Sequence, residues 1–153
     1  MMIDINSTEF FVMALTVAMA VLAMMFGQRT HNPATTVITS LSLNPCITSD
    51  DGLIVLQAQD NGDILLLRNG IPINDGDTIN IVATVIDDKL TIIEKKGVSS
   101  PSKTEVKVDG IATLSGLPID RYHVRYENEF TGQWALFTFA NKEGRTASSH
   151  LKY

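Results

Sequence analysis

Hydrophobic positions are distributed in two different ways along the chain. Residues 10–26 form one apolar stretch, in which 16 of 17 residues are hydrophobic and none is charged. After Gly27 the apolar residues instead alternate with polar ones in short runs separated by turn-forming residues. A long apolar run predicts a helix in a bilayer, whereas alternation predicts strands with one buried face. The sequence therefore predicts a short anchor followed by a β domain.

The apolar stretch has the length of a membrane span. About 20 helical residues, with about 17 as the lower limit, cross a hydrocarbon core about 30 Å thick. Asn6 and Glu9 have the spacing of a capping box, and a helix over residues 7–28 would be about 33 Å long. We therefore expect a transmembrane helix within residues 1–28. Small residues at four-residue spacing would let this helix pack closely against another: Ala14, Ala18, Ala23 and Gly27.

Two other interpretations of this stretch remain open. Ala18-Met19-Ala20 is similar to a signal-peptide cleavage site, although no Lys or Arg precedes the apolar run. A helix buried in a soluble domain would normally have a polar face, which this stretch lacks. The orientation is also open, because Arg29 is the single basic residue close to the span. The positive-inside rule then favours a cytoplasmic β domain only weakly, and a translocated domain fits equally well.

Nine β-type runs follow a polar linker over residues 29–35. Asn-Gly, Asp-Gly and similar dipeptides separate them and favour turns, because glycine adopts positive φ without a Cβ clash. The predicted strands are Thr36–Leu43, Leu53–Ala58, Asp63–Arg68, Thr78–Ile86, Lys89–Lys95, Lys103–Val108, Ile111–Leu114, Arg121–Glu127 and Trp134–Ala140. The predicted turns are Asp51-Gly52, Asn61-Gly62, Asn69-Gly70, Asp75-Gly76, Asp87-Asp88, Asp109-Gly110 and Thr131-Gly132.

The alternation is clearest in the run Arg121–Glu127, where Tyr122, Val124 and Tyr126 share one face. Many short strands of this kind, with no convincing helix among them, are typical of a β-sandwich or barrel. We predict a mainly β protein: a transmembrane helix (1–28), a linker (29–35), an antiparallel β-sandwich (36–140) and a polar C-terminal tail (141–153). The tail is expected to be flexible or docked on a partner.

One segment carries a family resemblance. It reads Leu114-Ser115-Gly116-Leu117-Pro118-Ile119-Asp120-Arg121-Tyr122-His123-Val124. This segment resembles the closing strands of bacterial immunoglobulin-like domains, which often carry Leu-x-x-Leu-Pro-x-Gly-x-Tyr-x-Val, although Asp120 stands where that family usually has glycine. The resemblance covers the C-terminal strands only. It implies an immunoglobulin-like sandwich with Tyr122 as a tyrosine corner, and it implies no catalytic residue.

Charge and residue chemistry argue against several functions. The chain has 12 Lys and Arg against 17 Asp and Glu, so it lacks the excess of basic residues typical of a nucleic-acid-binding protein. Cys46 is the only cysteine, so no intramolecular disulfide can form, and a buried or half-buried thiol is expected. His31, His123 and His150 do not have metal-ligand spacing, and no nucleophile or phosphate-loop motif occurs. We expect no enzyme activity, no metal and no cofactor.

Two further patterns have both a structural and a functional interpretation. Acidic clusters at 50–51, 60–63, 74–77 and 87–88 lie where turns are expected, so turn formation is favoured over calcium binding. The C-terminal aromatic residues are expected to pack in the core, with a stacking surface for a sugar or peptide as the alternative: Tyr122, Tyr126, Phe130, Trp134, Phe137 and Phe139.

These properties favour a non-enzymatic, single-pass membrane protein with a structural role. We expect the lipid bilayer and other protein subunits, including further copies of this chain, as partners, and no nucleic acid. Such a protein would belong to a larger membrane-associated assembly, either a cell-envelope complex or a membrane-containing virion. The alternative is an exported adhesive domain that binds carbohydrate or protein through its turn loops.

Overall fold

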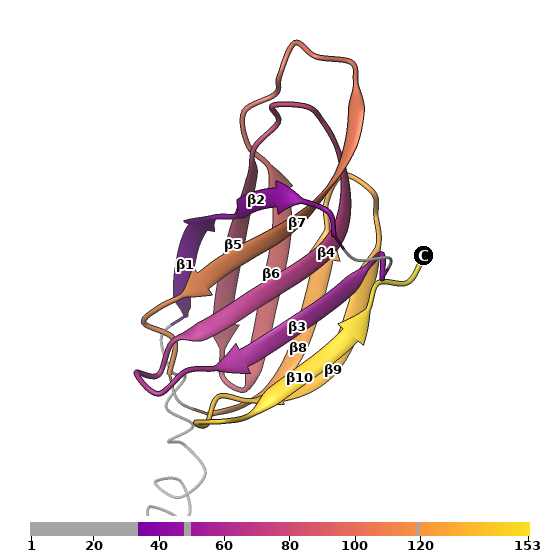
Figure 1. Ribbon diagram of the computed structural model, residues 1–153. Coiled ribbons are helices and arrows are strands. Elements are labelled where there is room, and N and C mark those ends of the chain that lie inside the picture. Colours follow the sequence, from indigo (N-terminus) through magenta and orange to yellow (C-terminus); the bar gives the residue numbers. More distant parts are fainter. Residues whose placement is uncertain (1–33, 48–49, 119) are drawn as a thin grey trace, which may run out of the picture. The chain divides into compact units, whose positions relative to one another are not determined.

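The alternation in the sequence corresponds to alternating burial along ten strands in a computed structural model, which describes residues 34–47, 50–118 and 120–153 (Figure 1). The strands are β1 (Thr35–Ser40), β2 (Ser42–Pro45), β3 (Leu53–Ala58), β4 (Ile64–Asn74), β5 (Ile79–Ile86), β6 (Lys89–Lys96), β7 (Glu105–Leu114), β8 (Arg121–Asn128), β9 (Trp134–Ala140) and β10 (Thr146–His150). The prediction of a mainly β protein is confirmed for these residues.

The N-terminal predictions lie outside this part of the chain. Contacts divide the chain into Met1–His31 and Asn32–Tyr153, and the strands all belong to the second unit. The expected transmembrane helix and its packing residues Ala14, Ala18, Ala23 and Gly27 fall outside the described residues. Within the described ranges, the fold contains no helix that could span a bilayer.

Two five-stranded sheets form the sandwich. Sheet A has the order β1-β5-β6-β8-β9, and sheet B has the order β10-β3-β4-β7-β2. Neighbouring strands are antiparallel except for β6 and β8, which are parallel because the chain crosses to β7 in sheet B between them. The inward-facing residues of both sheets, such as Leu56, Leu66, Ile81, Ile92 and Val124, form one continuous core.

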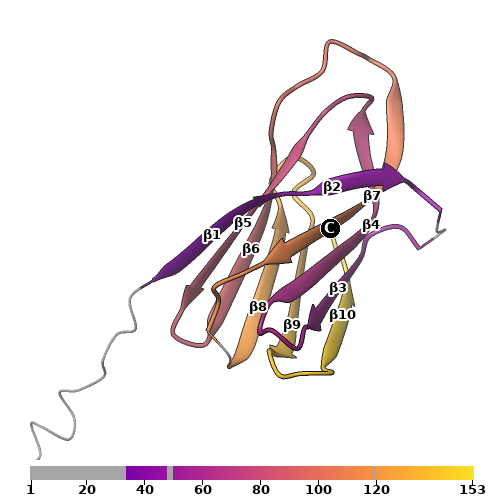
Figure 2. The same ribbon diagram turned by 60° about the vertical axis from the view of Figure 1, so that its left-hand side comes forward.

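Both long sides of the sandwich are bridged by the chain. On one side, only Leu41 separates β1 in sheet A from β2 in sheet B, so one extended segment passes between the sheets (Figure 2). Leu41 is buried, and its N–H donates to the Ile79 carbonyl at 2.9 Å. On the other side, Trp134 at the start of β9 exchanges two backbone hydrogen bonds with Lys152, at 3.0 and 2.8 Å.

The predicted turns Asn69-Gly70 and Asp109-Gly110 were wrong, because both dipeptides lie within strands. They face each other across β4 and β7, where the register shifts between Arg68 and Ile71. Gly70 has φ +66°, and its N–H donates to Asp109 Oδ1 at 2.9 Å. This arrangement is a β-bulge, which inserts a residue without ending the strand. Asp51-Gly52, Asp75-Gly76 and Asp87-Asp88 do form turns, as predicted.

The expectation of a polar tail over residues 141–153 is corrected by β10. This strand pairs with β3 along its whole length, so the sandwich extends beyond residue 140. Asn141 is buried where β9 ends, and its side chain donates to the carbonyls of Gly62 and Pro118 at 3.1 and 3.4 Å. A polar composition was compatible with a strand because β10 lies at a sheet edge, with three of its five residues exposed.

Candidate functional site

Two charged side chains meet inside the sandwich. Arg68 projects inward from β4 of sheet B and Glu94 projects inward from β6 of sheet A, with 1% and 0% of their side chains exposed. Arg68 Nε donates to Glu94 Oε2 at 3.2 Å. The ion pair therefore links the two sheets through the core.

Hydrogen bonds satisfy both oxygens of the buried carboxylate. The Tyr126 hydroxyl donates to Glu94 Oε2 at 2.9 Å, and Asn128 Nδ2 donates to Oε1 at 3.1 Å. Arg68 also donates to the Asn69 carbonyl at the bulge. Asn128 Oδ1 accepts the backbone N–H groups of Phe130 and Thr131, so the network continues into the β8–β9 turn. We call Arg68, Glu94, Tyr126 and Asn128 the core network.

Burial dominates the titration of this network. Desolvation raises the pKa of Glu94 above its usual value, although the Arg68 charge and the hydrogen bonds act in the opposite direction. Desolvation and the neighbouring Glu94 charge raise the pKa of Tyr126 well above its usual value. Because all four side chains are buried, the network offers solutes no accessible acid or base. Its geometry suits holding two sheets together rather than chemistry on a substrate.

The bulge determines which residues of β4 face inward. Before it, Ile64, Leu66 and Arg68 alternate into the core; after it, Ile71 and Ile73 do so, although their numbers have the opposite parity. On β7, burial acts to raise the pKa of Asp109, but hydrogen bonds from the N–H groups of Gly70 and Ile47 hold this pKa below its usual value. An ionised Asp109 thus stabilises the bulge beside Arg68.

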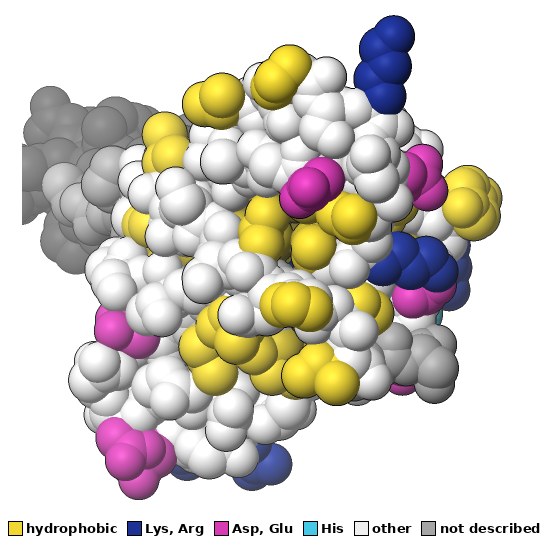
Figure 3. All heavy atoms as spheres, turned by 45° about the horizontal axis from the view of Figure 1, so that its top comes forward, with side chains coloured by type: hydrophobic (Ala, Val, Ile, Leu, Met, Phe, Trp, Pro, Cys, Tyr) yellow, Lys and Arg dark blue, Asp and Glu magenta, His cyan; other side chains and the backbone are white. Residues whose placement is uncertain are grey.

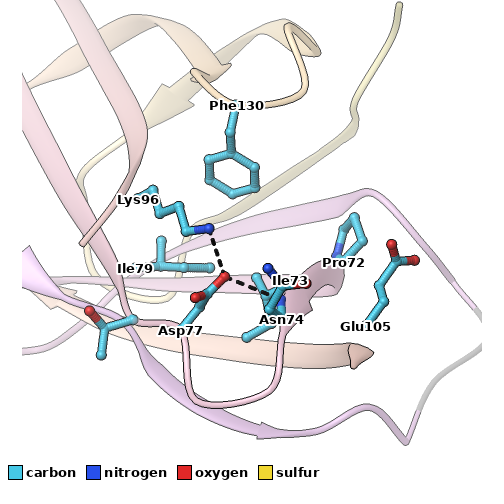
Figure 4. Close-up of a pocket in the computed structure, with 9 residues that line it drawn as sticks. Pro72, Ile73, Asn74, Asp77, Ile79, Lys96, Glu105 and Phe130 are labelled. Atoms are coloured by element: carbon cyan, nitrogen blue, oxygen red, sulfur yellow. Dashed lines mark hydrogen bonds and ion pairs between the residues drawn. The ribbon is translucent and has the colours of Figure 1, made fainter. Parts of the chain in front are cut away.

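A small cavity lies near the β4–β5 turn (Figure 4). Lys96 points toward Asp77, with 2.9 Å between Nζ and Oδ2, and the Phe130 ring lies on the other side of the Lys96 side chain. Asp77 also accepts the N–H groups of Ser100 and Asn74, at 2.7 and 3.2 Å. The hydrogen bond from Lys96 is the main cause that lowers the pKa of Asp77. The cavity volume of about 160 Å³ is below the range of about 300–1,000 Å³ that is usual for small-molecule sites.

The acidic clusters take part in turn geometry. Asp77 binds the backbone of its own turn, and Asn61 and Asp63 exchange hydrogen bonds at 2.9 and 3.0 Å. The interpretation of these two clusters as turn-forming residues is therefore confirmed. Within the described ranges, no three His, Cys, Asp or Glu side chains are grouped as metal ligands would be.

The outward face of sheet B carries aliphatic side chains. Val55, Leu67 and Ile111 lie side by side on β3, β4 and β7, and Leu53 and Leu65 flank them on the same face. We call these five residues the outer aliphatic face. Figure 3, which views the molecule from the sheet B side and from above, shows hydrophobic side chains clustered near the middle.

A hollow of about 550 Å³ adjoins this face. Its lining includes Cys46, Ile47, Leu67 and Ile111. Ile111 is 41% exposed and Ile47 is 91% exposed. The outward face of an antiparallel sheet is usually polar, and clustered exposed apolar residues typically mark an interaction site. The outer aliphatic face is therefore the strongest candidate for a binding surface among the described residues.

The residues singled out from the sequence do not meet in one site. Tyr122 is buried, and its hydroxyl donates to the Pro118 carbonyl four residues upstream. Cys46 is half-buried beside the hollow, as expected. His123, on β8 of sheet A, is exposed next to Asp88, as its place on the polar face of the strand predicted. His150, on β10 of sheet B, is exposed next to Asp50.

The aromatic residues divide between core and surface. Tyr122, Tyr126 and Phe139 are buried, and Phe137 packs against the core, so the core interpretation is confirmed for these four. Phe130 and Trp134 are more than one-third exposed. They lie in different places, Phe130 at the Asp77 cavity and Trp134 on the outward face of β9.

Sequence reasoning missed the core network. The signal was present in the strand period, because Glu94 continues the inward positions of Leu90 and Ile92, and Arg68 continues those of Ile64 and Leu66. Two opposite charges at inward positions of different strands predict a buried pair, since an unpaired buried charge is costly.

Comparison of the chain with family models, curated proteins and solved structures gave no significant match.

Proposed function

We propose that this protein is a non-enzymatic structural component of a larger membrane-associated assembly, held in the bilayer by residues 10–26 and binding neighbouring protein subunits through its β-sandwich. The outer aliphatic face is the observation that carries this proposal. A soluble sheet that acted alone would gain from polar outward residues, whereas Val55, Leu67 and Ile111 place apolar surface on three adjacent strands.

The chemistry of this face favours a protein partner. Its side chains are aliphatic, whereas recognition of a sugar ring usually relies on the flat face of an aromatic side chain. Charged pairs lie near the face, with Lys107 bound to Asp51 and His150 beside Asp50. An apolar centre with a polar rim is the usual anatomy of a protein–protein interface.

An immunoglobulin-like architecture is part of the same proposal. Two antiparallel-rich sheets support it, as does the hydrogen bond from Tyr122 to Pro118, which is the kind of bond a tyrosine corner makes. The resembled domains are mainly structural or adhesive. The core network fits a structural role, because it joins sheets A and B by polar contacts of defined geometry.

Site-specific photocross-linking in native membranes tests the partner surface. A photoreactive residue in place of Ile111 or Leu67 should give discrete products with other proteins. The matched control replaces Glu143, which is exposed between β9 and β10, and should give few. Equal products from all three positions, or none from Ile111 and Leu67, would contradict the proposal.

An exported adhesive domain is the second candidate function. Trp134, which is 39% exposed on β9 and followed by the exposed Leu136 on the same face, is the observation that favours it. This candidate requires the sandwich to lie outside the cell, so it predicts protease sensitivity on intact cells or particles. It also predicts that the domain binds glycans on an array and that the variant Trp134→Ala loses this binding. Full protection from protease would exclude it.

A further inference from the structure

Among the described residues, strand β1 forms an unprotected edge of sheet A. It pairs with β5 on one side, and no other described strand pairs with it in sheet A. Its sequence, Thr35-Thr36-Val37-Ile38-Thr39-Ser40, contains no charge and no proline, and its register with β5 runs without a bulge. Natural sheet edges usually carry such features, because a bare edge pairs with other strands. Figure 2 turns this edge toward the viewer.

The other sheet edges are protected in ways that β1 is not. At the opposite ends of the two sheets, the edge strands β9 and β10 contact each other, and Trp134 of β9 is bridged to Lys152, just beyond the end of β10. In sheet B, β2 has only four residues and ends at Pro45, a residue that limits further pairing because proline has no N–H. Among the described strands, β1 therefore has the edge best suited to accept another strand.

The free backbone groups of β1 follow from its pairing with β5. The N–H of Leu41 points to β5, where it donates to the Ile79 carbonyl. Backbone groups of a strand point to alternate sides at successive residues. Thr35, Val37 and Thr39 therefore bond to β5. The N–H and C=O groups of the other three residues, Thr36, Ile38 and Ser40, point away from it.

The side chains of the same three residues lie on the outward face of sheet A. They are the exposed positions of β1, and Ile38 is 72% exposed. Ile38 stands opposite Val82 on β5, which stands opposite Ile93 on β6. An apolar row thus crosses three strands and ends at the free edge with its most exposed member.

We propose that the edge of β1 pairs with β1 of a second copy of this chain, antiparallel and with the two-fold axis at Ile38. Ile38 of each copy then lies opposite Ile38 of the other, and each Thr36 lies opposite a Ser40. Three such pairs with two bonds each form six backbone hydrogen bonds and join the two copies of sheet A into a ten-stranded sheet. The apolar rows of the two copies become one continuous row.

This inference rests on the proposed function, because it identifies a second copy as one of the subunits in the assembly. Pairing at Ile38 is the register that uses the free backbone groups of all three residues, Thr36, Ile38 and Ser40, in each copy. A shift by one residue would place outward side chains opposite inward ones, so it is excluded where one face is buried. Anchoring two copies in one membrane raises their effective concentration, so a short edge contact is sufficient to pair them.

Disulfide trapping of the full-length protein in mild detergent or membranes tests this pairing. In a Cys46→Ser background, Ile38→Cys should form a dimer on mild oxidation, because directly opposed residues have Cα atoms about 5.5 Å apart, within disulfide range. Thr36→Cys is the matched control and should not trap a dimer with itself, since two copies of residue 36 would lie far beyond that range. Mixing Thr36→Cys with Ser40→Cys should restore the dimer.

Three results would overturn the pairing: no dimer from Ile38→Cys, equal dimer from Thr36→Cys, or a faster dimer from Val37→Cys. Trp134 fluorescence, from the only tryptophan in the chain, establishes that each variant is folded. The variant Ile38→Lys should abolish the dimer while cross-links from Ile111 to other proteins persist. If Ile38→Cys traps no dimer but those cross-links form, self-pairing alone fails. If the dimer forms without them, the proposed partner surface fails.

Discussion

The buried pair Arg68–Glu94 is an unusual way to join two sheets. A buried ion pair rarely adds stability over apolar side chains of the same volume, but removing one partner is costly. Here both carboxylate oxygens and the arginine have further partners, including Tyr126 and Asn128. We interpret the core network as a device for specificity, because these polar contacts form in only one relative placement of sheets A and B.

Glu94 should make the folded protein less stable as the pH rises. Burial raises its pKa in the folded state above the unfolded value of about 4.5. The stabilising contribution of the proton is therefore complete below the unfolded pKa and is lost as the pH rises through the folded-state pKa. Glu94→Gln keeps the shape and removes this titration. We expect the free energy of unfolding of the wild type, minus that of Glu94→Gln, to fall with pH above about 4.5 and then level off.

Urea unfolding of both full-length proteins in detergent, followed by Trp134 fluorescence across this pH range, measures the difference. Other titrating groups are common to both proteins and cancel. A difference that increases with pH would show that the attraction of Arg68 outweighs burial at Glu94.

For single residues, the strand period predicted which side chains face the core and which face solvent. It correctly placed Tyr122 and Tyr126 inward and His123 outward. The same period contained the inward positions of Arg68 and Glu94. It could not show that the two side chains meet, because they belong to different sheets, and pairing across a sandwich depends on how the sheets are stacked.

Among the secondary-structure elements, the bulge in β4 has the clearest steric requirement. Gly70 has positive φ, and a Cβ at this position would lie 2.8 Å from Asp51 Cα, a backbone atom that cannot rotate away. Gly116 also has positive φ, but nothing lies within 4 Å of its would-be Cβ. A side chain at either position would therefore strain the backbone, but only at Gly70 would it also clash with a neighbouring segment.

We expect Gly116→Ala to lower the free energy of unfolding by about 1–2 kcal/mol, the cost of left-handed backbone in a residue with a Cβ. Gly70→Ala should lower the free energy of unfolding by about 1–3 kcal/mol more than Gly116→Ala does, which is the usual cost of overpacking. Urea unfolding of both variants gives the comparison. Equal losses would mean that the Asp51 segment moves aside freely.

The errors at the level of elements have a common physical origin. Asn-Gly and Asp-Gly favour positive φ, but turns and bulges both use that conformation. A sequence alone therefore marks the position of Gly70 without showing whether the strand ends there. The strand β10 was missed because its polar residues lie at an edge, where strand pairing with β3 replaces burial as the stabilising interaction.

For the whole molecule, the sequence was sufficient to predict two sheets of short strands but not their closure. The single predicted run Thr36–Leu43 divides between β1 in one sheet and β2 in the other, and Trp134 of β9 is bridged to Lys152, 18 residues further along the chain. Among the described strands, these links close the other edges and leave β1 open. The proposed function relies on the outer aliphatic face, and the proposed pairing relies on the open edge of β1. Both assume a membrane anchor, so both depend on whether residues 10–26 remain part of the mature protein.

The anchored arrangement predicts that the full chain stays in the membrane and that its sandwich does not. The full-length protein should remain in the membrane pellet after alkaline carbonate extraction, because residues 10–26 would lie in the hydrocarbon core. Cleavage at a protease site inserted within the predicted linker, residues 29–35, should release the sandwich into the soluble fraction. A matched variant with Leu15→Arg and Val21→Arg should lose membrane retention, since each charge at the centre of a span costs about 2.5–3.5 kcal/mol in insertion.

N-terminal sequencing of the mature protein decides between an anchor and a signal peptide. A mature protein that begins at Val21 would mean that a leader is cleaved after Ala20. The sandwich would then reach its partners without an anchor of its own.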